Sequence, residues 1–248
     1  MRLLALILIS AAVLASPAAA VKELGHDITF GPGDSYSGYY VPGRGVSCPG
    51  LVMIHEWWGL NSYIKMQAWA YSRLGYNVLA VDLFGRSTTD QAEAMKMVQA
   101  LDQKAATSEL LAAAEYLRSA EHSSGRVGSI GWCFGGGQSL TLALNDSKLD
   151  AAVIYYGQPV TDPALVAKIK CPILGLYGED DKSIPLEKVR DFDKALTAAG
   201  VIHSIQTYPG AGHAFANPTR GTAYKPAAAK DANKRSAAFL AKYLKQPL

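Results

Sequence analysis

Short apolar runs, rich in β-branched residues, alternate with longer segments of helical periodicity along most of the chain. Most of these runs are apolar at every position, as expected of parallel strands that helices cover on both faces. The alternation therefore predicts an α/β fold with a mostly parallel, doubly wound sheet. The predicted strands are residues 51–55, 76–81, 127–130, 151–155, 173–177 and 204–208, and the predicted helices are residues 62–74, 89–121, 135–144, 185–199 and 222–244.

The segment ahead of the first buried run has a different pattern. Two short runs, residues 28–30 and 36–41, are separated by Gly and Pro, which predicts an N-terminal antiparallel hairpin at the edge of the sheet. The connection between residues 156 and 171 is too short to hold a lid domain. We therefore expect one domain over residues 21–248, with no separate lid domain and an open site.

The first residues of the chain have the composition of a cleaved signal peptide, residues 1–20. Met1 and Arg2 precede an apolar run over residues 3–14, and the small residues from Ala18 to Ala20 supply a cleavage site. An uncleaved membrane anchor is the alternative, although the run is short for a bilayer span. We therefore expect an exported protein, periplasmic or secreted, whose mature form binds no membrane.

Composition and charge argue against a nucleic-acid partner, and the cysteines differ in their sequence context. The chain of 248 residues is 49% hydrophobic and 18% charged, and its formal net charge of +3 is too small to indicate nucleic-acid binding. Its three cysteines differ in context: Cys48 and Cys171 each precede a Pro and open an apolar run, whereas Cys133 lies between glycines. Cys133 is therefore the candidate for chemistry.

The surroundings of Cys133 resemble a nucleophile turn. Cys133 follows a predicted strand and precedes a predicted helix, with Gly131 and Gly135 on either side. This is the pattern G-x-S-x-G with Cys in place of Ser, in which glycines make room for a strained strand-to-helix turn. The helix N-terminus favours a thiolate and offers backbone N–H groups to an oxyanion. A small buried Cys beside a glycine-rich turn is the alternative explanation.

A base and an acid follow in the order that such a nucleophile requires. A cysteine nucleophile needs a base, and the base needs an acid that orients it. The predicted strand 173–177 runs into Asp180 and Asp181, and the predicted strand 204–208 runs into His213 in a Gly-rich loop. The order nucleophile, acid, histidine, each after a strand, is that of hydrolytic triads on α/β folds. On these grounds alone, either aspartate could be the acid.

Six motifs together resemble the dienelactone hydrolase family of the α/β-hydrolase superfamily. The resemblance covers nearly all of the mature chain and implies an α/β-hydrolase fold. It also implies hydrolysis of ester or lactone carbonyls by a Cys-His-Asp triad with no metal and no cofactor. The family pattern places the acid three residues after Gly178 and four before Pro185, which selects Asp181. The motifs are residues 54–59, 82–86, 131–136, 155–157, 178–185 and 212–215.

The usual strand order of the α/β-hydrolase fold bears on the two other cysteines. Strands opened by Cys48 and Cys171 are not neighbours in that order, and adjacent strands already lie about 4.8 Å apart. A disulfide tolerates a Cα separation of only about 6 Å. We therefore expect no bridge between Cys48 and Cys171.

Glu56 and the backbone around it complete the predicted site. A carboxylate directly after an apolar strand, beside Trp57, is costly unless it has a partner or a role. In the resembled family the matching Glu switches the cysteine between thiol and thiolate, while a Glu bonded to its own loop is the structural alternative. The backbone N–H groups of Trp57 and Phe134 are expected to form the oxyanion hole. A zinc site at His55 is excluded, because the required second His is replaced by Gly59.

Arg86 matches a family arginine that holds a substrate carboxylate, a task for which a guanidinium is suited. The family's second such arginine lies four residues after the catalytic His, where this chain has Asn217, although Arg220 lies close by. We therefore expect an exported hydrolase acting on a small-molecule ester or lactone, and a monomer is favoured. A non-catalytic protein of the same fold that binds a ligand or partner is the alternative.

Overall fold

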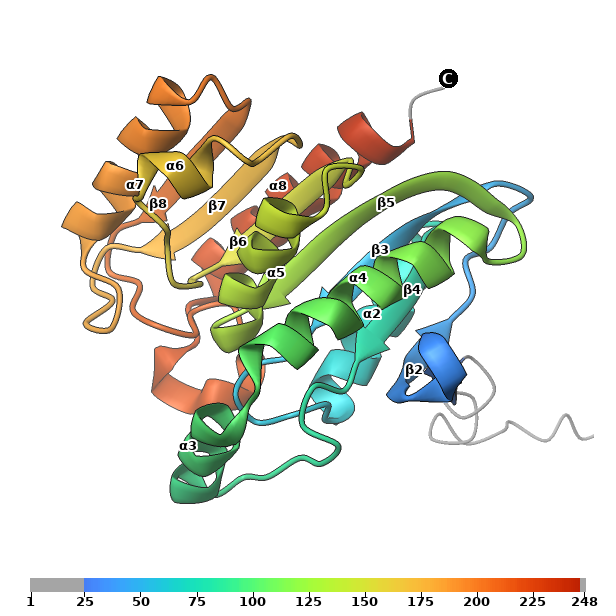
Figure 1. Ribbon diagram of the computed structural model, residues 1–248. Helices are drawn as coiled ribbons and strands as arrows, with labels where there is room; N and C mark the ends of the chain where they lie inside the picture. Colours follow the sequence, from blue (N-terminus) through green and yellow to red (C-terminus); the bar gives the residue numbers. More distant parts are fainter. Residues whose placement is uncertain (1–24, 246–248) are drawn as a thin grey trace, which may run out of the picture.

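An eight-stranded sheet with helices on both faces forms the protein (Figure 1). The computed structural model describes residues 25–245, so the predicted signal peptide lies outside the described residues. The strand order is β1-β2-β4-β3-β5-β6-β7-β8, in which β1 and β2 are antiparallel and the other strands are parallel. The strands are β1 His26–Phe30, β2 Tyr36–Val41, β3 Cys48–Ile54, β4 Asn77–Val81, β5 Ser123–Trp132, β6 Ala151–Tyr155, β7 Ile173–Gly178 and β8 His203–Tyr208.

The six apolar runs and the hairpin are confirmed as strands of this sheet. Every residue of β3, β4, β6 and β7 is buried, because helices cover both faces. The hairpin of β1 and β2 lies at one edge, and β2 pairs with β4 in antiparallel fashion. Between β6 and β7 there is only the four-residue helix α6, Pro163–Val166.

Two predicted helices have different bounds in the structure. The span 89–121 is divided into α3 and α4, because the backbone is extended at Leu101 and the Asp102 side chain accepts from the N–H groups of Lys104 and Ala105, which starts a new helix. The helix predicted from residue 222 begins only at Pro226. The helices are α2 Ser62–Arg73, α3 Gln91–Ala100, α4 Gln103–Ser119, α5 Phe134–Asn145, α7 Leu186–Ala198 and α8 Pro226–Leu244, with 3-10 turns η1 Pro32–Asp34 and η2 Pro218–Ala223.

Each face of the sheet has its own apolar core. Helices α4, α5 and α7 pack on one face, where Val52 and Ile54 of β3 point, and α2 and α8 pack on the other, where Leu51 and Met53 point. Alternate residues of a strand point to opposite faces, so one continuous apolar run supplies both cores. Among the helices of residues 25–245, none combines the length and apolar composition needed to cross a membrane.

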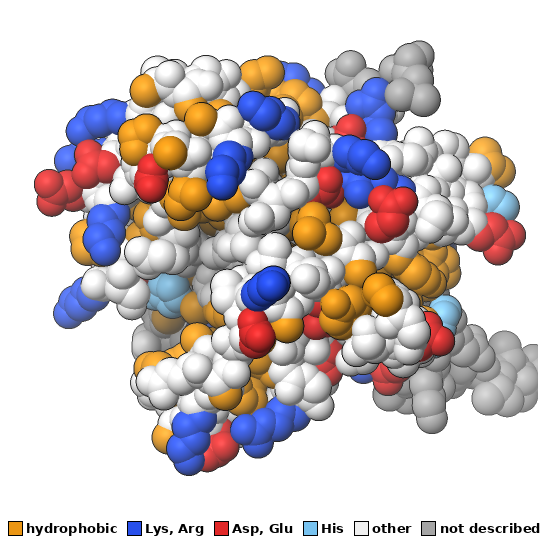
Figure 2. Space-filling model, in the orientation of Figure 1, with side chains coloured by type: hydrophobic (Ala, Val, Ile, Leu, Met, Phe, Trp, Pro, Cys, Tyr) orange, Lys and Arg blue, Asp and Glu red, His pale blue; other side chains and the backbone are white. Residues whose placement is uncertain are grey.

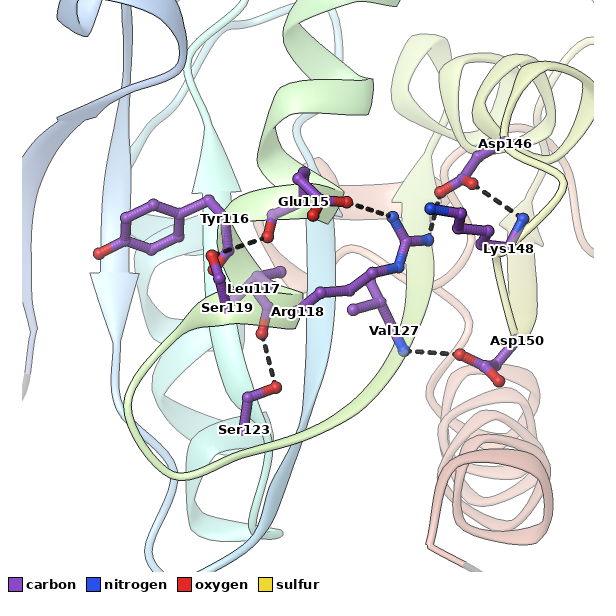
Figure 3. Close-up of polar contacts among 10 residues, drawn as sticks. All are labelled: Glu115, Tyr116, Leu117, Arg118, Ser119, Ser123, Val127, Asp146, Lys148 and Asp150. Atoms are coloured by element: carbon purple, nitrogen blue, oxygen red, sulfur yellow. Dashed lines mark hydrogen bonds and ion pairs between the residues drawn. The ribbon is translucent and has the colours of Figure 1, made fainter. Parts of the chain in front are cut away.

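A partly buried polar network lies around the amino-terminal half of β5, away from Cys133 (Figure 3). Arg118 of α4 donates to Asp146 at 2.5 Å and to Glu115 at 3.4 Å, and Asp146 follows α5. The Val127 N–H donates to Asp150 at 2.8 Å. These bonds tie α4 and the end of α5 together beside β5, the strand that leads to Cys133.

The three cysteines are free thiols in the structure, and the predicted separation of the strands opened by Cys48 and Cys171 is confirmed. Cys48 begins β3, Cys171 lies just before β7, and strands β5 and β6 separate the two. Both thiols are buried, and burial raises the pKa of Cys171 to about 12. Neither thiol is therefore suited to act as a nucleophile.

Candidate active site

The candidate site lies where the parallel strands end. Cys133 follows β5, Asp181 follows β7, His213 follows β8 and Glu56 follows β3. Because β3, β5, β6, β7 and β8 are consecutive neighbours in the sheet and run in the same direction, their carboxyl ends share one edge. Ligand sites of open α/β sheets occupy this edge.

The turn at Cys133 is strained, as predicted from its glycines. Cys133 has a φ of 56° and a ψ of −119°, in a region that L-residues rarely adopt, and it caps helix α5. A Cβ on Gly131 would collide with the carbonyl of Gly135, and a Cβ on Gly135 would collide with the carbonyl of Ile54. Glycine is therefore required at both positions, and the sulfur stands at the helix N-terminus.

The structure brings Cys133, His213 and Asp181 into one hydrogen-bonded chain. Cys133 Sγ lies 3.0 Å from His213 Nε2, and His213 Nδ1 lies 2.7 Å from Asp181 Oδ2. The other oxygen of Asp181 accepts from the N–H groups of Ser183 and Ile184, at 2.8 and 3.1 Å, which fixes the carboxylate. Asp181 is buried, whereas Asp180 is exposed, and it is Asp181 that contacts the imidazole.

The charge state of His213 follows from these contacts. Burial lowers the pKa of His213, but its hydrogen bonds with Asp181 and Cys133 outweigh burial and raise the pKa to about 10. The imidazolium is thus the favoured form when the sulfur is a thiolate. The ring of Tyr156 packs edge-on against His213 at 5.2 Å and limits its movement.

Glu56 has a buried partner that the sequence did not reveal. Its side chain is only 2% exposed, and burial raises its pKa, an effect that the Asn217 hydrogen bond and the charge of Arg220 oppose. Asn217 Nδ2 donates to Glu56 Oε2 at 2.6 Å. Asn217 therefore serves Glu56 at the position where the resembled family has a substrate-binding arginine. Among residues 25–245, no hydrogen bond joins Glu56 to Cys133.

His55 supports the loop that carries Trp57. The imidazole is fully buried between Phe84 and Phe134, with ring centroids at 4.8 and 6.0 Å, and burial lowers its pKa to about 4. Nδ1 lies 2.6 Å from the carbonyl oxygen of Glu56. A carbonyl can only accept, so Nδ1 carries the proton of this neutral ring. That carbonyl and the Trp57 N–H belong to the same peptide group, which His55 therefore holds in one orientation.

Two backbone N–H groups remain available beside the sulfur. Within residues 25–245, neither the Trp57 N–H nor the Phe134 N–H donates a hydrogen bond. Trp57 lies in the turn after β3, and Phe134 is the first residue of α5; both line the cavity above Cys133. Trp57 and Phe134 thus lie on elements that the neighbouring strands β3 and β5 position.

The structure does not bring Arg86 to this cavity. Its guanidinium is 59% exposed and pairs with Glu93 of α3 at 3.4 Å. The backbone of Arg86 is the part held in place, because its carbonyl occupies the space that a Cβ on Gly59 would need. The arginine that lines the cavity is Arg220, whose guanidinium stacks over the Trp58 ring at 4.1 Å.

A cavity of about 990 Å³ surrounds these groups, and most of its lining is apolar. Cys133, His213 and Glu56 lie at its base, with Phe134 and Tyr156 beside them. Helix α3 supplies a further wall, and Figure 2 shows hydrophobic side chains exposed among the charged ones in that part of the surface, at the lower left. Among residues 25–245, no group of three or more His, Cys, Asp or Glu side chains is arranged to hold a metal ion.

Comparison with known proteins identifies similar chains. Residues 37–244 match the model of the Dienelactone hydrolase family. The carboxymethylenebutenolidase of Pseudomonas putida is 30% identical over 205 residues, which cover 78% of this chain and 85% of that protein. Protein usf of Aquifex pyrophilus is 32% identical over 213 residues, covering 79% and 89%. A dienelactone hydrolase-like promiscuous phosphotriesterase from metagenomic libraries shares the fold, with a TM-score of 0.81, 24% identity and coverage of 89% and 98%.

Proposed function

This chain belongs to the dienelactone hydrolase family, and we propose that it opens its substrate by nucleophilic attack of the Cys133 thiolate. Its family makes it a hydrolase of esters or lactones. The observation that carries the proposal is the chain from Cys133 Sγ through His213 to Asp181, with distances of 3.0 and 2.7 Å, on a strained turn at a helix N-terminus. Nucleophile, base and orienting acid are thus within reach of one another.

The proposed reaction proceeds in two acyl-transfer steps. The Cys133 thiolate attacks the carbonyl carbon, and the negative charge that moves to the carbonyl oxygen is stabilised by the N–H groups of Trp57 and Phe134. As the tetrahedral intermediate collapses, His213 gives its Nε2 proton to the leaving oxygen, and a thioester remains. His213 then takes a proton from water, which attacks the thioester and releases the carboxylic acid and the thiolate.

Glu56 is proposed to adjust the charge of this site. A buried carboxyl whose pKa is raised takes up a proton more readily than an exposed one, and it lies within the electrostatic reach of His213. Protonation of the thiolate between turnovers would protect the sulfur from oxidation. Asn217 supports this role by holding the carboxyl in place.

Turnover and thiol labelling together test the proposed function. A panel of esters and lactones is incubated with the protein before and after treatment with iodoacetamide, and the labelled cysteine is located by mass spectrometry. We expect hydrolysis that alkylation abolishes, with the label on Cys133 and not on the buried Cys48 or Cys171, and protection by substrate. Full activity after complete labelling of Cys133 would contradict the proposal, and no turnover of any ester or lactone would favour a ligand-binding protein.

Replacing His55 tests whether it holds the oxyanion peptide. His55→Phe keeps an aromatic ring between Phe84 and Phe134 but removes the donor to the Glu56 carbonyl. We expect kcat to fall about tenfold with little change in KM, since loss of a whole oxyanion donor costs on the order of 10²–10³. His55→Gln retains an N–H donor and should recover part of the loss. A fall in thermal stability that accounts for the lost activity, or a change in KM alone, would argue against this role.

Arg86 and Arg220 differ in their expected effect on anionic substrates. A charge-assisted bond contributes roughly 1.5–3 kcal/mol, so the arginine that holds a substrate carboxylate gives at least a tenfold preference for it. Because Arg220 lines the cavity and Arg86 pairs with Glu93 outside it, we expect Arg220→Gln to reduce kcat/KM for a carboxylate lactone more than for its methyl ester. Arg86→Gln should leave the ratio unchanged. The reverse pattern would restore the sequence-based assignment of the carboxylate to Arg86.

We also propose that the protein is exported after cleavage near Ala20. The proposal rests on the charged start, the apolar run over residues 3–14 and the small residues before Val21. Cell fractionation with intact-mass measurement tests it, and the expected product is a soluble chain in the exported fraction that lacks residues 1–20. A full-length chain in the membrane fraction would indicate the anchor instead.

A further inference from the structure

The apolar face of helix α3 is covered by the protein along only part of its width. Ala94 and Met97 are buried in the protein, whereas Met95 and Val98 line the cavity. Met95 is 45% exposed, and Leu101, just after the helix, continues the same lining. The exposed part of such an apolar face is unfavourable in water unless something covers it. We call Met95, Val98 and Leu101 the α3 wall.

The charged groups of this helix point elsewhere. Glu93 is paired with Lys96 at 2.7 Å and with Arg86 at 3.4 Å, and none of the three lines the cavity. Opposite the α3 wall, the lining continues with apolar residues, Val160 before α6 and Ile184 before α7. The space between these surfaces therefore suits an uncharged, apolar group.

The glutamines that line the cavity near the α3 wall are neutral, and two of them are paired with each other. The side-chain amides of Gln103 and Gln138 donate to each other at 2.9 and 2.8 Å, forming a closed pair at the edge of the cavity. Arg220 is the guanidinium of the lining, and its charge lies against the Trp58 ring and near Glu56. No Lys side chain lines the cavity in the part of the chain that the structure describes.

The order of the strands indicates which part of a substrate reaches the α3 wall. Helix α3 follows β4, on the β3 side of Cys133, whereas His213 and Asp181 follow β8 and β7, on the other side. His213 protonates the leaving group in the proposed reaction, so the leaving group lies on the β7–β8 side. The acyl part of the substrate is then directed toward α3.

We propose that the α3 wall binds an elongated, apolar part of the acyl group, which favours medium-chain acyl esters over acetates and alkyl-substituted lactones over unsubstituted ones. The inference rests on the proposed acyl transfer to Cys133. It assigns Met95, Val98 and Leu101 to selection of the acyl group, and it gives the exposed part of the apolar face of α3 a role that core packing does not supply.

A chain-length series tests the proposal. We measure kcat/KM for p-nitrophenyl esters from acetate to octanoate and expect a rise of about two- to fourfold for each methylene that contacts the α3 wall. In Met95→Asp the ratio of octanoate to acetate should fall at least tenfold, because a charge replaces the apolar contact, and Met95→Leu should preserve the ratio. Met66→Asp is the matched control: Met66 is 50% exposed on α2, outside the cavity, and this variant should keep the wild-type ratio.

A second series separates acyl from alcohol selection. Alkyl acetates that lengthen only the alcohol should show no comparable rise with chain length and no response to Met95→Asp. A flat acyl series, an unchanged ratio in Met95→Asp, or selection that follows the alcohol chain would each overturn the inference, while Cys133-dependent turnover would leave the proposed function intact. Absence of turnover with every ester would overturn both.

Discussion

Cys133→Ala is expected to abolish hydrolysis while the protein remains folded. The variant removes the only atom that forms a bond to the substrate in the proposed reaction, and removal of the nucleophile of a serine triad costs on the order of a millionfold in kcat. The side chain is half-buried beside His213 and packs only against the outside of one apolar core, and the change removes a single sulfur atom, so the folded state should survive. The measurements are kcat/KM with an ester substrate and the melting temperature.

Two further variants make this result specific. Cys133→Ser should retain little activity, because a hydroxyl ionises far less readily than a thiol and the site lacks a stronger base than His213. Cys48→Ala removes a thiol at the opposite end of the same sheet and should keep full activity. Substantial esterase activity in Cys133→Ala, at a melting temperature like that of the wild type, would show that another group is the nucleophile.

Asp181→Asn is expected to lower kcat by up to about ten-thousandfold, as the matching change does in a serine triad. The carboxylate accepts the Nδ1 proton of His213 at 2.7 Å, and an amide can present its donor there and favour the wrong tautomer. Asp180→Asn is the matched control on the adjacent residue. Because Asp180 is exposed and does not contact His213, we expect it to retain nearly full activity. A larger loss in Asp180→Asn would place the acid one residue earlier.

The same pair of variants should differ in pH dependence. Contacts with Asp181 and Cys133 raise the pKa of His213 to about 10, above its ordinary value, although burial opposes them. The proton that His213 gives to the leaving group is therefore retained up to that pH, and kcat/KM should decline only as the pH rises through about 10. Loss of the Asp181 charge lowers this pKa, so the alkaline limb should move to lower pH in Asp181→Asn. An unmoved limb would show that it reports another group.

The sequence by itself determined the elements that depend on short-range pattern. Alternation of apolar runs with helical periods predicted the parallel strands, since burial of both faces requires apolar residues at every position of a strand. Gly131 and Gly135 predicted the turn at Cys133, because a Cβ at either position would meet backbone within a few residues or across one strand. The order of Cys133, the pair Asp180 and Asp181, and His213, each after a strand of a parallel sheet, then predicted that these groups lie at one edge of the sheet; the family pattern selected Asp181.

Other features were decided only by the tertiary structure, because they depend on where a long side chain points after its loop has folded. The sequence predicted that Arg86 binds a substrate carboxylate. In the structure Arg86 pairs with Glu93 of α3, and Arg220 is the arginine that lines the cavity. Asn217 marked a missing arginine in the sequence, yet contact with Glu56, 161 residues earlier, made it a buried hydrogen-bond donor. These contacts depend on how loops fold and often join residues that are far apart in the sequence, so a local sequence pattern does not predict them.

The helices between β4 and β5 show the same difference between what the sequence predicts and what only the tertiary structure decides. Periodicity predicted one helical span over residues 89–121, because the pattern of apolar residues continues through the break. The extended backbone at Leu101 and the cap at Asp102 turn the chain there. As a result, Met95 and Val98 of α3 face the cavity, while Leu110 of α4 packs in the core. The sequence pattern does not distinguish an apolar residue that packs in the core from one that lines a substrate cavity. Only the packing of neighbouring elements decides which of the two it is.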